Sequence, residues 1–221
     1  MNQAKELKQA IVFIDGNNLY HNLKASFLSP GTINLRRLSE LITEHFNCKL
    51  KDIEYFNSVP SIEDGKNKYE GHMKYLESLR KQGIEVKTRK LQRHSNQERI
   101  QIIDNEISLL GLCKACEPVV KSHWKDYIGS VSVKEKGIDI MIATAMIRHS
   151  MIAKDCNACI LISGDADFIP CMEVIKSAGV WVATVCTAKG YSFQLRQSEN
   201  EPAFPWFILD KDWLRRNCTK Q

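Results

Sequence analysis

Four aspartates lie at positions where their carboxylates could bind a metal ion. These residues are Asp15, Asp139, Asp165 and Asp167. Asp15 and Asp165 each follow a short apolar run, the pattern by which an α/β protein places acids at the carboxyl ends of parallel strands. Carboxylates held close together repel one another unless a cation neutralises them, and hard oxygen ligands suit Mg²⁺ or Mn²⁺. The pattern therefore predicts metal-assisted chemistry.

Four polar residues lie beside these acids in the sequence and are candidates for substrate binding. They are Asn17, Asn18, Lys136 and Ser163. The two asparagine amides could hold substrate or a water, although asparagine is also common in turns. Ser163 could hydrogen-bond an acid of the cluster, and Lys136 could contact a scissile phosphate. The acids have structural roles open to them too, because Asp15 or Asp167 could cap a helix.

Apolar runs and helical repeats alternate along the chain. We expect strands at 11–15, 53–59, 84–91, 158–163 and 180–186, and helices at 17–24, 35–46, 69–79, 139–147 and 170–179. Strands that alternate with helices predict a mostly parallel sheet covered on both faces. In such an α/β fold, Asp15 and Asp165 are expected at the ends of adjacent central strands.

Length and composition fit a single domain spanning residues 1–221, with 43% hydrophobic residues for its core. No apolar stretch approaches the roughly 20 residues that a membrane-spanning helix needs. The polar N-terminus does not resemble a signal peptide, so we expect a cytoplasmic protein with reduced cysteines. A formal net charge of +5 would suit a polyanionic partner without requiring one.

Residues from about 105 to 135 are expected to form an irregular excursion from this domain. Just before it, Ile100, Ile102 and Ile103 indicate a strand or a short hydrophobic turn. Cys113 and Cys116 have the spacing of half a zinc site. Because no convincing second pair of ligands accompanies them, exposed reduced thiols are the plainer alternative to bound Zn²⁺.

Three segments together resemble the NYN domain of the LabA-like group, relatives of the PIN-domain ribonucleases. The segments are Val12-Phe13-Ile14-Asp15-Gly16-Asn17-Asn18, Lys136-Gly137-Ile138-Asp139-Ile140 and Ser163-Gly164-Asp165-Ala166-Asp167-Phe168-Ile169-Pro170. The resemblance implies a PIN-like Rossmannoid three-layer fold, a Mg²⁺ or Mn²⁺ site formed by the four aspartates, and cleavage of RNA phosphodiester bonds. Many relatives carry a further acid where this chain has Ala145, which leaves the number of metal ions open.

The leading hypothesis is a metal-dependent endoribonuclease, a hydrolase that prefers single-stranded RNA and could act as a homodimer. The alternative is a catalytically weak RNA-binding or regulatory protein of the same fold, in which the acids hold a structural cation. A phosphatase acting on small phosphate esters is disfavoured because Gly16, not a spaced second acid, follows Asp15. A glycine-rich phosphate loop is absent from the sequence, which argues against an ATPase.

Overall fold

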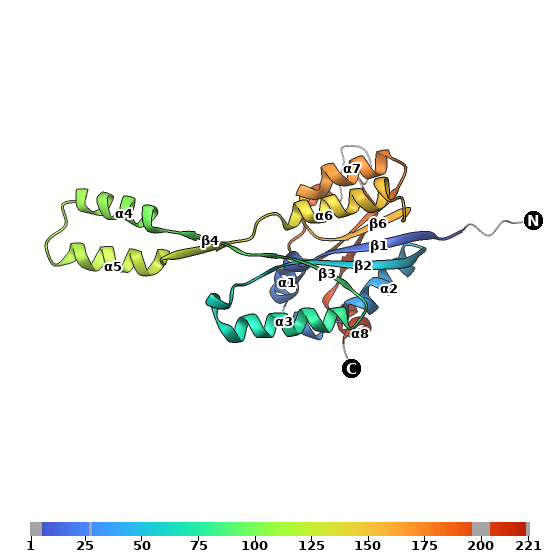
Figure 1. The fold of residues 1–221 in the computed structure, drawn as a ribbon, viewed down its shortest axis with the longest axis horizontal. Coiled ribbons are helices and arrows are strands. Elements are labelled where there is room, and N and C mark those ends of the chain that lie inside the picture. Colours follow the sequence, from blue (N-terminus) through green and yellow to red (C-terminus); the bar gives the residue numbers. More distant parts are fainter. Residues whose placement is uncertain (1–5, 27, 196–203, 220–221) are drawn as a thin grey trace, which may run out of the picture. The chain divides into compact units, whose positions relative to one another are not determined.

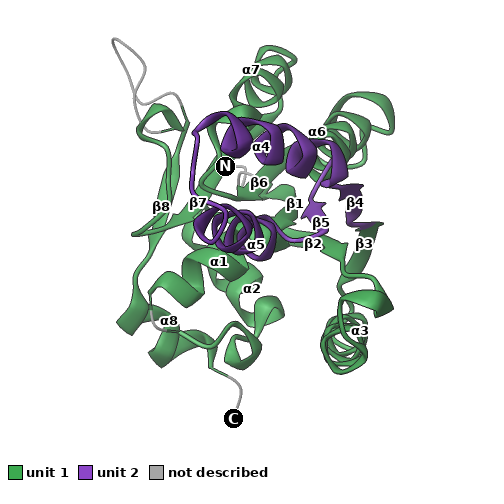
Figure 2. Ribbon diagram, turned by 90° about the vertical axis from the view of Figure 1, so that its left-hand side faces the viewer, with its two compact units in different colours: residues 1–89, 137–221 green, residues 90–136 purple. Residues whose placement is uncertain are grey.

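The computed structural model describes residues 6–26, 28–195 and 204–219, which fall into two compact units (Figures 1 and 2). Unit 1 comprises residues 1–89 and 137–221, and unit 2 comprises residues 90–136. Each unit has its own secondary structure.

Unit 1 is built on a six-stranded sheet with the order β3-β2-β1-β6-β7-β8. The strands are β1 (Lys8–Asp15), β2 (Cys48–Val59), β3 (Glu85–Lys90), β6 (Ala158–Ile162), β7 (Trp181–Thr187) and β8 (Trp206–Leu209). The pairs β1–β2, β1–β6, β6–β7 and β7–β8 are all parallel. The prediction of an α/β fold with a mostly parallel central sheet is confirmed.

Helices cover both faces of this sheet and give a three-layer arrangement. On one face lie α1 (Gly16–Ala25), α2 (Leu35–His45), α3 (Lys66–Arg80) and α8 (Lys211–Cys218), and on the other lie α6 (Ile138–Ile147) and α7 (Ile169–Ser177). Because successive side chains of a strand point to opposite faces, Val12 and Ile14 enter the first core while Ile11 and Phe13 enter the second.

Short helical segments complete unit 1. They are the 3₁₀ turns Pro30–Thr32, Ile62–Asp64, Ala166–Phe168 and Phe193–Leu195, and the π-helical turn Arg148–Ile152. Pro170 lies in the first turn of α7, where a proline needs no amide donor, as its position in the sequence predicted. No helix within the described ranges combines the length and apolar character needed to cross a membrane.

The strand order reverses direction between β1 and β6. The chain runs outward from β1 through β2 to β3, and after unit 2 it returns to β6 and runs through β7 to β8. Such a reversal leaves a crevice at the carboxyl ends of the two strands, where α/β proteins bind ligands. Ile14 lies level with Ile162 across this pair, so Asp15 and Ser163 begin the two segments that border the crevice.

Unit 2 is regular, contrary to the irregular excursion expected at about 105–135. It consists of β4 (Gln92–Ser95), α4 (Gln97–Leu109), α5 (Cys116–Ile128) and β5 (Val131–Lys134), with β4 and β5 paired antiparallel. The strand or turn expected around Ile102 is instead part of α4. The sequence did not predict these helices because two helices that pack only against each other bury few residues. Ile107 of α4 is buried, whereas Ile102 and Leu109 are exposed.

Candidate acidic site

Asp15 is the buried member of the acidic site, with 5% of its surface exposed. One carboxylate oxygen accepts a hydrogen bond from the backbone N–H of Asn18 at 3.0 Å and so caps α1. The other oxygen accepts a hydrogen bond from the Ser163 hydroxyl at 3.0 Å. The carboxylate therefore caps α1, and Ser163, the residue after β6, also fixes its orientation.

Ser163 links the two segments that border the crevice. Besides donating to Asp15, its hydroxyl oxygen accepts a hydrogen bond from the backbone N–H of Asp165 at 3.2 Å. The side chain of Asp165 in turn accepts from the N–H of Asp167 at 3.0 Å and starts the 3₁₀ turn. The sequence predicted that Ser163 would hydrogen-bond an acid, and this contact is present.

Asp139 comes from the opposite layer, in the first turn of α6. Gly137, the residue before α6, has φ +84°, a left-handed conformation that a residue with a Cβ rarely adopts. The chain turns at this glycine directly into α6, so Asp139 lies near the helix N-terminus, where a negative charge is favoured. The left-handed backbone at this position thus explains why the Lys-Gly-Ile-Asp segment contains a glycine.

The four acids lie close enough to influence one another electrostatically. Burial raises the pKa of Asp15 above its ordinary value of 3.8, and the charges of Asp139 and Asp165 raise it further. The two hydrogen bonds to Asp15 act in the opposite direction. Burial also raises the pKa of Asp139, and repulsion from Asp165 and Asp167 adds to this effect. The sheet edge therefore gathers negative charge that a cation would relieve.

The chemistry of these groups fits a hard divalent cation such as Mg²⁺ or Mn²⁺, which prefers carboxylate oxygens. Mutual repulsion between the acids is the feature of the structure that supports this fit. Within the described residues, however, no three or more His, Cys, Asp or Glu side chains already stand as a ligand set. Ligation by these acids would therefore need side-chain adjustment.

The side chain of Asn18 joins α1 to the segment after β6 by hydrogen bonds. Its side-chain oxygen accepts hydrogen bonds from the backbone N–H of Gly164 at 3.0 Å and from the amide of Asn22 at 2.9 Å. Asn22 also reaches the carbonyl of Gly190 at 3.3 Å. The side-chain oxygen of Asn18 thus connects α1 to the segment after β6, and a role of its amide in substrate binding stays a prediction.

The two remaining candidates for substrate binding lie in different units. Asn17 is half-buried in the first turn of α1, next to the acids. Lys136 is exposed at the end of unit 2, three positions before Asp139 in the sequence. For both residues, a role in substrate binding stays a prediction.

Sequence reasoning missed two polar residues at the carboxyl end of β2. Asn57 and Ser58 are 3% and 5% exposed, and they follow Phe56, the residue level with Asp15 in the neighbouring strand. The Asn57 amide donates to the hydroxyl of Tyr55 at 2.9 Å, but within the described structure its oxygen and the Ser58 hydroxyl have no partner. Their signal was a polar pair directly after an apolar run, the same signal that marked Asp15.

The Cys113–Cys116 pair lies in unit 2, at the start of α5, and both side chains are exposed. The N–H of Cys116 lies 3.4 Å from the sulfur of Cys113. Among the residues that the structure describes, no third metal-binding side chain joins them. A Zn²⁺ ion at this pair stays a prediction.

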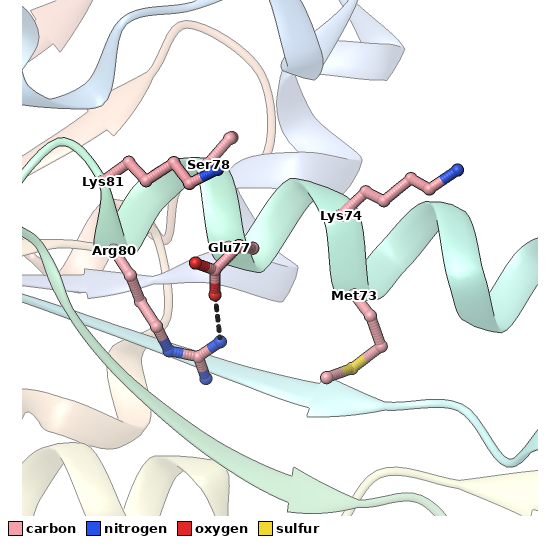
Figure 3. Close-up of a pocket in the computed structure, with 6 residues that line it drawn as sticks. All are labelled: Met73, Lys74, Glu77, Ser78, Arg80 and Lys81. Atoms are coloured by element: carbon pink, nitrogen blue, oxygen red, sulfur yellow. Dashed lines mark ion pairs between the residues drawn. The ribbon is translucent and has the colours of Figure 1, made fainter.

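A shallow depression of about 520 Å³ lies elsewhere in unit 1, along the C-terminal half of α3 (Figure 3). Glu77 and Arg80 form an ion pair of 3.6 Å on its border, and Lys74 and Lys81 extend from the same helix. A helix that follows a parallel strand ends at the amino edge of the sheet. The depression therefore belongs to the edge opposite the acids.

Two comparisons with known proteins bear on this geometry. The NYN domain family, part of the PIN-like nuclease superfamily, matches residues 9–202. The chain is also similar to the crystal structure of a protein of unknown function from Vibrio parahaemolyticus, with a TM-score of 0.56 and 16% identity over 95% of this chain and 98% of that one. At that identity the likeness shows the fold alone, and no curated protein matches the chain. Since the family match covers most of the sequence, including all four acids, the chain belongs to the NYN domain family.

Proposed function

We propose that this protein is a metal-dependent endoribonuclease of the LabA-like group, acting on single-stranded RNA. The observation that carries the proposal is the position of Asp15, Asp139, Asp165 and Asp167 at the reversal point of the sheet, where their charges repel. Membership in a family of the nuclease superfamily supports the same reaction class.

In this proposal the four aspartates hold one or more Mg²⁺ or Mn²⁺ ions. A bound divalent cation would offset the negative charge that develops on the phosphate during cleavage. Asp15 is the most firmly oriented of the four, because Asn18 and Ser163 each hold one of its oxygens. Asp165 starts a 3₁₀ turn and Asp167 is exposed. An exposed carboxylate of this kind can orient a water molecule for attack on the phosphorus.

Asn17 of unit 1 and Lys136 of unit 2 are further proposed contacts to the RNA, each considered within its own unit. The ammonium group of Lys136 would neutralise a phosphate next to the scissile bond, as lysine does in other phosphate sites. The side-chain amide of Asn17 would donate to a phosphate or ribose oxygen. Both assignments predict weaker substrate binding, rather than loss of chemistry, when the residue is replaced.

The test is cleavage of a labelled single-stranded RNA in Mg²⁺, Mn²⁺ or EDTA by the wild type and Asp165→Asn. We expect metal-dependent cutting by the wild type and at least a roughly 100-fold loss in the variant, since removal of a supporting ligand alone costs 10–100-fold. Asp52→Asn is the matched control, because Asp52 is an exposed aspartate in the first half of β2, away from the carboxyl edge. Its activity should equal that of the wild type.

Cutting that is equal in the wild type and Asp165→Asn would identify a contaminant and refute the assignment of the site. If the wild type binds several RNAs but cuts none of them in either metal, the protein is a binding or regulatory member of the family.

A further inference from the structure

The charges of unit 2 are divided between its strands and its helices. Residues 90–95 and 131–136, which we call the basic ribbon, contain four Lys or Arg residues and one Glu. Residues 96–130, which include the two helices, contain four Lys or Arg residues and five Asp or Glu residues. The excess positive charge of the unit therefore lies on the ribbon.

Ion pairing strengthens this division. In the helices, Lys121 pairs with Glu117 at 2.6 Å and Lys125 pairs with Asp104 at 2.8 Å. In the ribbon, Lys90, Lys134 and Lys136 are exposed, and they make no ion pair with any residue that the structure describes. Lys121 and Lys125 are thus each paired with an acid of the helices, whereas these three ribbon lysines have no ion-pair partner among the described residues.

The ribbon has no burial that would explain its polarity. All four residues of β4 are exposed. Gln92 opposes Lys134 and His94 opposes Ser132, so these four polar side chains share one face of the strand pair. A two-stranded ribbon with one wholly polar face presents hydrogen-bond donors in a row, as a phosphate backbone requires.

An exposed aromatic residue lies at the far end of this ribbon. Asn96 follows β4, and its side chain donates to the carbonyls of Ile128 and Gly129 at 3.2 and 3.1 Å. These bonds hold the end of α5 against the end of the ribbon. Tyr127, the preceding residue in α5, is 78% exposed and makes an edge contact with Trp124. A ring presented in this way can stack on an unpaired base.

We propose that the basic ribbon binds the phosphate backbone of single-stranded RNA and that Tyr127 stacks on one of its bases. The inference rests on the proposed function, because it takes RNA as the substrate. It adds that unit 2 binds this RNA. Duplex RNA, whose bases are already stacked, would gain nothing from Tyr127.

The test is the binding of a short fluorescent single-stranded RNA in EDTA, measured by anisotropy over a series of salt concentrations. The first variant combines Lys90→Gln with Lys134→Gln. Loss of two phosphate contacts should weaken binding roughly tenfold and reduce the slope of log affinity against log salt by about 1.4, or about 0.7 for each contact. The matched control combines Lys74→Gln in α3 with Lys81→Gln just after it; both lysines are exposed (Figure 3). It should bind as the wild type does.

The second variant is Tyr127→Ala, with Tyr127→Phe as its control. Loss of one stacking contact should weaken binding roughly tenfold without changing the salt slope, and phenylalanine should restore the affinity. Neither tyrosine variant should affect binding of a duplex of the same length.

Equal loss in the ribbon and α3 variants, or none in either, would overturn the proposal. Equal weakening of single-stranded and duplex RNA by Tyr127→Ala would overturn the stacking contact. Because EDTA removes cleavage from the measurement, these results stand apart from the Asp165→Asn test. A ribbon that binds RNA in a protein that never cuts it would refute the nuclease alone, and a nuclease whose ribbon variant binds normally would refute the ribbon alone.

Discussion

At the scale of single residues, Asp15 combines two roles with opposite demands on its charge. As the cap of α1 it stabilises the helix, and as a buried acid near Asp139 and Asp165 it is costly to ionise. Active sites often contain buried charged groups of this kind, because a bound ligand or the reaction offsets the cost of ionising them. The two roles can be separated by substitution, since asparagine caps a helix about as well as aspartate does.

We predict that Asp15→Asn is more stable than the wild type near neutral pH in EDTA. The pKa of Asp15 is raised above 3.8 in the folded protein, so the fold binds this proton more tightly than the unfolded chain does. The stability contributed by the protonated group is lost as the pH rises through that raised pKa. The advantage of Asp15→Asn should therefore grow as the pH rises from about 4 through the raised pKa of Asp15.

Urea unfolding at several pH values measures this difference. Asp15→Ala provides the comparison, because alanine removes the charge together with the cap and should be about 1 kcal/mol less stable than Asp15→Asn. A difference between wild type and Asp15→Asn that does not change with pH would contradict the prediction.

At the scale of elements, the start of α1 depends on close packing against β2. Gly16 is the first residue of α1, and a Cβ there would lie 2.5 Å from the hydroxyl oxygen of Tyr55 and 2.6 Å from the carbonyl oxygen of Phe56. Both neighbours are fully or almost fully buried, so neither can move away freely. The glycine that follows Asp15 is thus needed for packing, not for a special turn.

We predict that Gly16→Ala lowers the free energy of unfolding by about 1–3 kcal/mol through overpacking. Gly71→Ala is the matched control, because Gly71 lies within α3 and nothing stands within 4 Å of its Cβ position. That substitution should instead stabilise the protein by roughly 0.5–1 kcal/mol. Thermal unfolding of the two variants measures both effects, and equal effects of the two alanines would show that Gly16 is not closely packed.

The elements that position the site could largely be predicted from the sequence. Apolar runs marked β1 and β6 as strands, and the acids after them marked the carboxyl edge of the sheet, because both signals are local. The hydrogen bond from the Gly164 N–H to the Asn18 side chain could not be predicted, since it joins positions 146 residues apart. The contacts of Glu54 could not be predicted either: this residue is buried in β2, forms an ion pair with Lys87 at 2.5 Å and lies 2.8 Å from Nε2 of His149.

The helices of unit 2 were not predicted from the sequence, for a different physical reason. The periodic spacing of apolar residues predicts a helix only when one face of that helix is buried. In α5 no residue is buried, and Val119 and Tyr127 are strongly exposed. The apolar and polar residues of such a helix need not separate into two faces, so no clear pattern results.

At the scale of the whole molecule, a cation bound by the four acids would relieve their mutual repulsion and so stabilise the folded protein. A ligand that binds only the folded state adds about 2.7 kcal/mol at 100 times its Kd, which corresponds to roughly 5–10 °C in Tm for a chain of this size. We predict such a rise for the wild type in saturating Mn²⁺ relative to EDTA. In Asp165→Asn the rise should be much smaller.

Differential scanning fluorimetry with Asp52→Asn as the control measures this coupling without any substrate. Equal rises in the wild type and Asp165→Asn would mean that the cation binds elsewhere on the protein. The outcome is independent of catalysis, so it also tests the site in a member of the family that does not cut RNA.

The pairing of β4 with β5 brings the beginning and the end of unit 2 together as neighbouring antiparallel strands. An insertion whose two ends lie side by side can be lengthened, shortened or exchanged at small entropic cost to the host fold. Unit 2 could therefore change in length or sequence while β1, β6 and the acids at their carboxyl ends keep their positions. If the proposed function holds, changes in unit 2 would alter which RNA is bound without altering the acidic site.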